Sequence, residues 1–140
     1  MKIKLSNVVK CFILFGFISC GEDAVEQTPE IPQEWKGENS DFENEFVAKT
    51  NGNETLILHR VTAKPFGGKV DRHGKSFTTT QNFENGKLNG RSIKKSFDGS
   101  WVEANYLDGK LNGEMIFYSK DGTRRSVLFF ENGVLKKDLK

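Results

Sequence analysis

Two related octapeptides constrain the fold of this chain more than any other feature. "FENGKLNG" at residues 83–90 returns as "YLDGKLNG" at residues 106–113, twenty-three positions later. Aligning residues 83–105 with residues 106–128 needs no gap and gives nine identities in twenty-three positions. A third, weaker copy, "FENGVLKK", occupies residues 130–137. A fixed period of this size is typical of a repeat array, in which each small unit buries its apolar face against its neighbours.

The same register continues upstream in a weaker form. "AKPFGG" at residues 63–68 holds the place of a degenerate unit, and His73-Gly74 stands in for one of its turns. Asn51-Gly52 lies a further twenty-two residues upstream and is interpreted as part of a still weaker unit. We therefore expect one repeat domain over residues 48–140.

Each unit carries two turn dipeptides. One series is Asn85-Gly86, Asp108-Gly109 and Asn132-Gly133, and the other is Asp98-Gly99 and Asp121-Gly122. Such pairs favour type I′ hairpins, because both central residues of that turn need a positive φ. The segments between the turns alternate as strands do, and turns every ten to thirteen residues leave no room for a helix of ordinary length. The sequence predicts an all-β fold, an elongated antiparallel meander of roughly eight short strands.

One aromatic residue, one leucine and one glycine recur in each unit. We expect the aromatic residues to stack along one face as a ladder, with the leucines beside them. The glycines are expected where a side chain would obstruct the neighbouring hairpin. The ladder is either ordinary core packing or an exposed strip that binds a sugar or a partner. The residues are Phe83, Tyr106 and Phe130; Leu88, Leu111 and Leu135; and Gly90 and Gly113.

The aromatic-x-x-Gly-x-Leu-x-Gly spacing of the two octapeptides, with "FDG" and "YSKDG" between them, resembles the variant MORN repeat of YwqK-type proteins. Members of that family are often labelled as antitoxins of toxin–antitoxin systems. The resemblance covers about residues 63–137, and Pro65 and Lys137 depart from it near the ends of the array. It implies an open sheet of stacked hairpins, which suits binding better than catalysis.

The first nineteen residues have the pattern of a lipoprotein signal peptide. Three lysines precede the uncharged stretch "CFILFGFIS", which is too short to span a bilayer. "FISC" at residues 17–20 resembles a lipobox, at which a bacterial prolipoprotein is diacylated and cut before the cysteine. Lipidation of Cys20 would add acyl chains at ~0.8 kcal/mol per buried methylene, enough for stable anchoring. Gly21 does not match the aspartate of the inner-membrane retention signal, so we expect an outer-membrane lipoprotein.

Residues 20–47 are predicted to be an acidic flexible tether. From Gly21 to Val47 nine acidic residues face a single lysine, and there is no hydrophobic period. Acidic stretches at this position resemble the surface-export signals of Bacteroidetes-type lipoproteins, so the protein faces either the periplasm or the cell exterior. Trp35 is either docked on the repeat domain or a lone aromatic residue in a linker.

Catalytic motifs are missing from the sequence. There is no HExxH, GxSxG or phosphate-binding loop, and His59 and His73 are the only histidines. Asp98, Asp108 and Asp121 each precede a turn glycine, which favours a structural role. With Cys11 removed in the signal peptide and Cys20 acylated, no thiol remains. The sequence therefore predicts a protein that is not an enzyme and needs no cofactor or metal.

The remaining candidates are aromatic and basic side chains of the repeat domain, which are either a binding surface or a solvated strand face. They are Phe83, Trp101, Tyr106, Tyr118, Phe130, Arg91, Lys94, Lys95, Arg124 and Arg125. Our main hypothesis is a lipid-anchored cell-envelope module that binds a protein, glycan or lipid partner. The alternative, suggested by the family resemblance, is an antitoxin or immunity protein that neutralises a toxin. An exported protein is not expected to bind nucleic acid.

Overall fold

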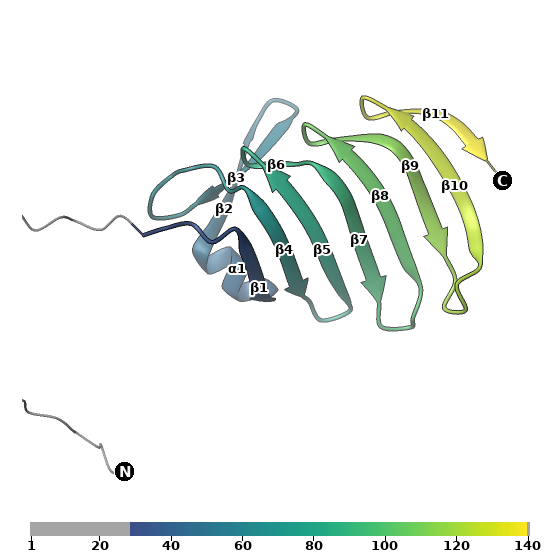
Figure 1. Cartoon of the computed structure of the whole chain (residues 1–140), viewed down its shortest axis with the longest axis horizontal. Coiled ribbons are helices and arrows are strands. Elements are labelled where there is room, and N and C mark those ends of the chain that lie inside the picture. Colours follow the sequence, from purple (N-terminus) through teal and green to yellow (C-terminus); the bar gives the residue numbers. More distant parts are fainter. Residues whose placement is uncertain (1–28, 140) are drawn as a thin grey trace, which may run out of the picture.

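A computed structural model describes residues 29–139 (Figure 1). The predicted signal peptide at residues 1–19 and the predicted lipidation site at Cys20 lie outside these residues. The fold is mostly β, with a nine-stranded, largely antiparallel sheet, a separate two-stranded hairpin and one short helix. The sheet contains β1 (Glu34–Glu38), β4 (Gly68–His73), β5 (Phe77–Glu84), β6 (Lys87–Leu88), β7 (Gly90–Ser96), β8 (Trp101–Leu107), β9 (Lys110–Tyr118), β10 (Arg124–Glu131) and β11 (Val134–Leu139). The helix is α1 (Asn39–Glu45), and the hairpin is β2 (Phe46–Asn51) with β3 (Glu54–His59).

The long strands of the sheet follow one another in chain order. From β4 to β11 each long strand pairs with the next in the order β4-β5-β7-β8-β9-β10-β11, always antiparallel. The two-residue strand β6 pairs with β5. The predicted antiparallel meander is confirmed in this form. β1 is the exception, because it pairs with β4 in parallel. The chain passes through α1 and the β2-β3 hairpin between these two strands, which gives it the length that a parallel connection requires.

The first series of turns has the predicted backbone geometry. Asn85, Asp108 and Asn132 have φ values of 49–50°, and the glycines that follow them have φ values of 79–81°. The second series does not, and the type I′ prediction is wrong there. In the turn of Asp98-Gly99 only the glycine has a positive φ, and the Gly99 amide donates to the Ser96 carbonyl at 3.1 Å. This arrangement is a type I turn followed by a left-handed glycine, which suits a three-residue loop.

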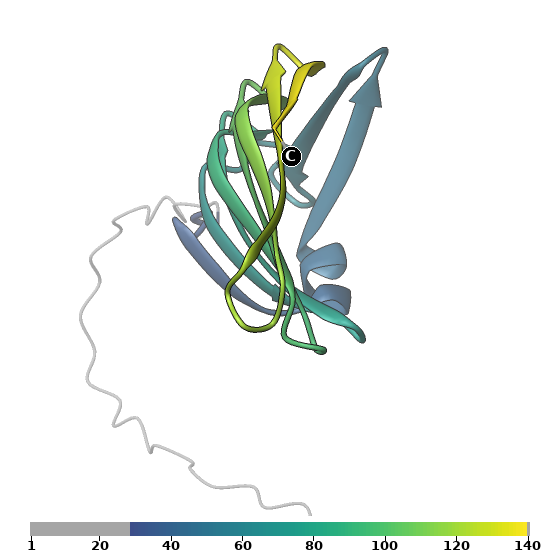
Figure 2. The ribbon, with the colours of Figure 1, turned by 90° about the vertical axis from the view of Figure 1, so that its right-hand side faces the viewer.

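The core lies at the N-terminal end of the sheet, where α1 and the β2-β3 hairpin cover one face (Figure 2). Its buried side chains are Trp35, Phe42, Phe46, Phe66, Val70 and Phe83. The rings meet mostly edge to face, with centroids 5.0 Å apart for Phe46 and Phe66 and 5.7 Å apart for Phe66 and Phe83. Edge-to-face packing is a preferred geometry of aromatic pairs, so one cluster ties helix, hairpin and sheet together.

The predicted tether is wrong for its second half. Residues 34–47 form β1, α1 and the beginning of β2, and three of their aromatic side chains enter the core. The indole Nε1 of Trp35 donates to the Glu45 carboxylate at 2.9 Å, so Trp35 is docked on the domain. The acidic composition suggested disorder, but three large aromatic side chains bury enough apolar surface to offset the ordering of a short segment. A helix as short as α1 depends on this packing for its stability.

The sheet is curved, and α1 and the hairpin lie on its concave side (Figure 2). We call the side that carries α1 the concave face and the opposite side the convex face. The concave face is covered over β1, β4, β5 and β6, and no other described element lies over β8 to β10. Within residues 29–139, no helix has the length and apolar character needed to cross a membrane.

Candidate binding face

The strand register divides the predicted binding residues between the two faces, since residues paired across strands share a face. Val70 lies in the core, and its partners fix the concave face along the whole meander. The concave set contains Phe83, Lys94, Tyr106 and Phe130, while the convex set contains Arg91, Lys95, Trp101, Tyr118 and Arg124. Arg125 falls at a register irregularity in β10 and lines a hollow on the concave face. The ten residues therefore do not form one site.

Three equivalent trios run along one end of the concave face. In each, an aromatic residue pairs with a positive-φ glycine on the preceding long strand and with a leucine across its own hairpin. The trios are Gly68, Phe83 and Leu88; Gly90, Tyr106 and Leu111; and Gly113, Phe130 and Leu135. In the described part of the chain no ring contact joins the three aromatic residues, and Phe83 instead contacts Phe66. The predicted stacked ladder is therefore wrong, because leucines separate the rings.

The recurring glycines are required by their backbone conformation. Gly90 has a φ of 85°, and a Cβ placed there would have no neighbour within 4 Å. At Gly113, with a φ of 100°, the nearest atom would be Asn105 Cβ at an ordinary 3.7 Å. Our expectation that a side chain would obstruct the next hairpin is thus wrong for these two residues, since positive φ alone accounts for them.

The open half of the concave face has two adjoining hollows whose linings are mostly polar. Their floor is an apolar strip formed by Val102 and Ala104 of β8 and Met115 and Phe117 of β9. One, of about 330 Å³, is lined by Thr79, Gln81, Ser92, Lys94, Val102, Ala104, Tyr106 and Met115. The other, of about 340 Å³, is lined by Lys94, Ser96, Ser100, Trp101, Val102, Phe117, Tyr118 and Arg125. Lys94 and Val102 belong to both, so the hollows form one surface. Among these described residues there are two basic side chains and no acidic one.

Two polar groups mark the border of this floor. The Lys94 ammonium lies 3.9 Å from the centroid of the Phe77 ring, which holds the charge above an aromatic face. Tyr106 is half-buried, and burial raises the pKa of its phenol above the ordinary value. A tyrosine hydroxyl is protonated at neutral pH, so this one can donate a hydrogen bond.

Aromatic and basic residues form a row on the convex face. Trp101 and Tyr118 stack with their centroids 4.6 Å apart and their planes at 9°. Lys95 pairs with Trp101, and Arg124 pairs with Tyr118, so the row reads cation, indole, phenol, cation. Each ring covers one face of the other, which leaves less ring surface for stacking on a sugar.

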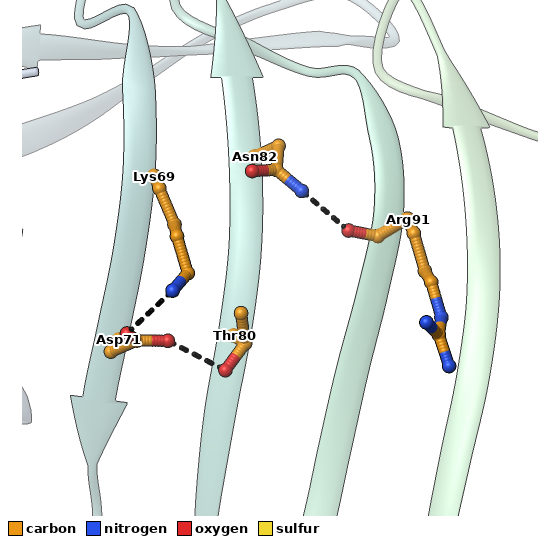
Figure 3. Close-up of polar contacts among 5 residues, drawn as sticks. All are labelled: Lys69, Asp71, Thr80, Asn82 and Arg91. Atoms are coloured by element: carbon orange, nitrogen blue, oxygen red, sulfur yellow. Dashed lines mark hydrogen bonds and ion pairs between the residues drawn. The ribbon is translucent and has the colours of Figure 1, made fainter. Parts of the chain in front are cut away.

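Several polar groups on the same face are paired with one another. The Asp71 carboxylate accepts from the Thr80 hydroxyl at 2.6 Å and lies 3.1 Å from the Lys69 ammonium (Figure 3). Burial opposes ionisation of Asp71, but these two contacts outweigh it and lower its pKa. Asn82 donates to the Arg91 carbonyl at 2.9 Å, and the Arg91 guanidinium lies 2.7 Å from Glu103.

The titratable groups considered for catalysis have structural roles where their contacts are described. Nδ1 of the buried His59 accepts from the Thr62 amide at 3.2 Å, within a turn. The Asp98 and Asp121 carboxylates accept from backbone amides two residues later, at 2.9 Å and 3.0 Å. Hydrogen bonds from Ser100 and from Thr123 lower the pKa of Asp98 and of Asp121 respectively. Residues 29–139 contain no group of three His, Cys, Asp or Glu side chains placed to hold a metal ion.

Sequence reasoning missed part of the concave floor. Met115 and Phe117 share the floor with Val102, but neither is among the binding residues that the sequence predicts. The period-2 alternation of a strand separates Met115 and Phe117 from Ile116 and Tyr118, which lie on the other face. That alternation was the available signal.

Comparison with known proteins finds no family model, no curated protein and no solved structure that matches the chain.

Proposed function

We propose that this protein is a non-catalytic binding or scaffold module of the bacterial cell envelope that holds a protein partner on the open half of its concave face. The observation that carries the proposal is the apolar floor over β8 and β9. The chain covers the first half of the same face with its own helix and hairpin but leaves this half open. A concave apolar surface with a polar border is typical of a binding site.

Hydrogen bonds between successive hairpins support this proposal. The Gly109 amide donates to the Leu88 carbonyl, and twenty-four residues later the Gly133 amide donates to the Leu111 carbonyl, both at 2.8 Å. Each type I′ turn is thus bonded to the preceding hairpin. We propose that these hairpins are units of the 23-residue repeat that resembles the variant MORN repeat. Stacked units of this kind offer an extended surface, which favours binding over catalysis.

The chemistry of the two faces favours a protein partner over a glycan. A sugar would need exposed ring faces, whereas Trp101 and Tyr118 cover each other. Val102, Met115 and Phe117 instead present aliphatic, thioether and aromatic surface side by side, as the centres of protein interfaces do. If the partner is a toxin, as the antitoxin hypothesis holds, it would bind the same concave face.

We propose that an acylated Cys20 anchors the module at the outer membrane, and the support for this is the resemblance of residues 17–20 to a lipobox. Residues 20–28 of the predicted tether lie outside the residues that the structure describes. Changing Cys20 to Ser should release the protein from the membrane fraction and abolish labelling with an acyl-chain analogue. An unchanged membrane fraction would contradict the anchor.

The binding face is tested by a matched pair of variants in the full-length protein. Val102 and Ile93 are both half-buried β-branched residues on central strands, and they lie on the concave and the convex face respectively. Chemical crosslinking in producing cells should yield a protein adduct that Val102→Lys abolishes and Ile93→Lys retains, with both variants checked for folding by circular dichroism. No adduct from the native chain, or equal adducts from both variants, would refute the proposal.

A further inference from the structure

The chain shows how a segment is held on its concave face, because α1 occupies the covered half. Three of the seven residues of α1 are acidic, and its Phe42 is 4% exposed. The Arg72 guanidinium on β4 lies 4.8 Å from the centroid of the Phe42 ring, and its charge is attracted to Glu43. An acidic segment with an inserted aromatic ring therefore sits over a cation of the sheet.

Lys94 occupies the corresponding place in the open half. Arg72 pairs with Thr79, Thr79 pairs with Lys94, and Lys94 pairs with Val102, so both cations stand in one cross-strand row of the concave face. They are also twenty-two residues apart, close to one repeat period. Arg72 is half-buried beside α1, whereas Lys94 is exposed. The row thus has one cation covered by α1 and one open cation, Lys94, which is exposed although its ammonium lies over the Phe77 ring of the neighbouring strand.

The charges near the open cation select the kind of partner. Lys94 and Arg125 line the hollow around Val102 and Phe117, and no acidic side chain joins them among the residues that line it. An acidic segment would meet complementary charge, and an aromatic side chain from it would meet the apolar floor. Complementary charge of this kind steers association and discriminates between partners.

We infer that the open half of the concave face binds an acidic protein segment that carries an aromatic side chain, in the way that the covered half holds α1. The inference rests on the proposed function, in which this face binds a protein, and it names the chemistry of the segment that is bound.

The test uses a fluorescein-labelled peptide with the sequence of residues 38–47, ENSDFENEFV, and the full chain carrying Cys20→Ser. Fluorescence anisotropy at low salt should show saturable binding. Lys94→Glu with Arg125→Glu should weaken it by about tenfold or more, since two attractive charges become repulsive. The control is Lys95→Glu with Arg124→Glu, which changes the net charge equally; Lys95 and Arg124 lie on the convex face. It should change the affinity by less than about twofold.

Two further peptides test the two parts of the recognition. Replacing both phenylalanines of the peptide by alanine should weaken binding, and so should replacing its acidic residues by their amides. No binding of the parent peptide, or equal loss in the two double variants, would overturn the inference. Binding that displaces the chain's own α1 would not depend on Lys94 and Arg125, and that result would also overturn it.

The failure of this inference can be told apart from the failure of the proposed function. If the crosslinked partner is lost with Val102→Lys but is unaffected by Lys94→Glu with Arg125→Glu, the face binds a protein and the inferred chemistry is wrong. If no partner depends on Val102, the proposed function itself is wrong.

Discussion

Removing the Phe42 ring tests whether the acidic N-terminal segment is part of the folded domain. Phe42 is 4% exposed, and its ring centroid lies 5.0 Å from that of Trp35 and 4.7 Å from that of Phe46. Truncating a buried phenylalanine to alanine costs about 3–5 kcal/mol. We expect about 3 kcal/mol for Phe42→Ala, because α1 is short and lies at one end of the sheet.

Urea unfolding monitored by tryptophan fluorescence and by circular dichroism measures this loss. With a slope of about 1.5 kcal/mol/M, a loss of about 3 kcal/mol lowers the midpoint by about 2 M. Phe97→Ala is the control, because Phe97 is 67% exposed and its removal should change the free energy of unfolding by less than about 0.5 kcal/mol. A loss below about 1 kcal/mol for Phe42→Ala would refute the packing of α1 and favour a tether that extends to residue 47.

Three further predictions concern single residues of the sheet. Gly68→Ala should lower the melting temperature far more than Gly90→Ala in a thermal scan, because both have positive φ but only at Gly68 would a Cβ lie 1.9 Å from the Gln33 carbonyl oxygen; equal effects would contradict this. Asp71→Asn should destabilise the protein by up to about 1 kcal/mol at pH 7. The lowered pKa of Asp71 gives stability that is present above the unfolded pKa of about 4 and is lost as the pH falls through the folded value, so the difference from the native chain should shrink and then vanish as the pH is lowered past that value. A difference that persists in acid would contradict the role of the Thr80 and Lys69 contacts. Trp101→Ala should remove the stacked pair with Tyr118 and so change the near-ultraviolet circular dichroism of the folded protein; an unchanged spectrum would contradict the stacking.

The parts of the fold that local chemistry decides could be predicted from the sequence. Asn85-Gly86 forms the expected type I′ turn, because both residues tolerate the positive φ that it needs. Asp98-Gly99 is a similar dipeptide, but it forms a different type of turn. There the Asp98 carboxylate accepts from the Ser100 amide, and a three-residue loop satisfies the strand ends. The dipeptide alone does not specify the loop length, which sets the type of turn.

The features that depend on contacts distant in sequence could not be predicted in the same way. Trp35 and Phe42 belong to a segment whose acidic composition suggested disorder, and they are buried in one cluster with Phe66, Val70 and Phe83, which lie further along the chain. The residues of the candidate site could not be assigned from the sequence for the same reason. Lys94 and Lys95 are adjacent and chemically identical, and the strand register decides which of them borders the open floor.

Site-specific photocrosslinking in cells that make the full-length protein tests the binding face most directly. Met115 is half-buried on the concave floor, and its neighbour Glu114 is exposed on the convex face. A photoreactive amino acid at position 115 should crosslink to a partner protein, and the same residue at position 114 should not. Crosslinking at position 114 alone, or at neither position, would contradict the proposal that the open half of the concave face holds a protein.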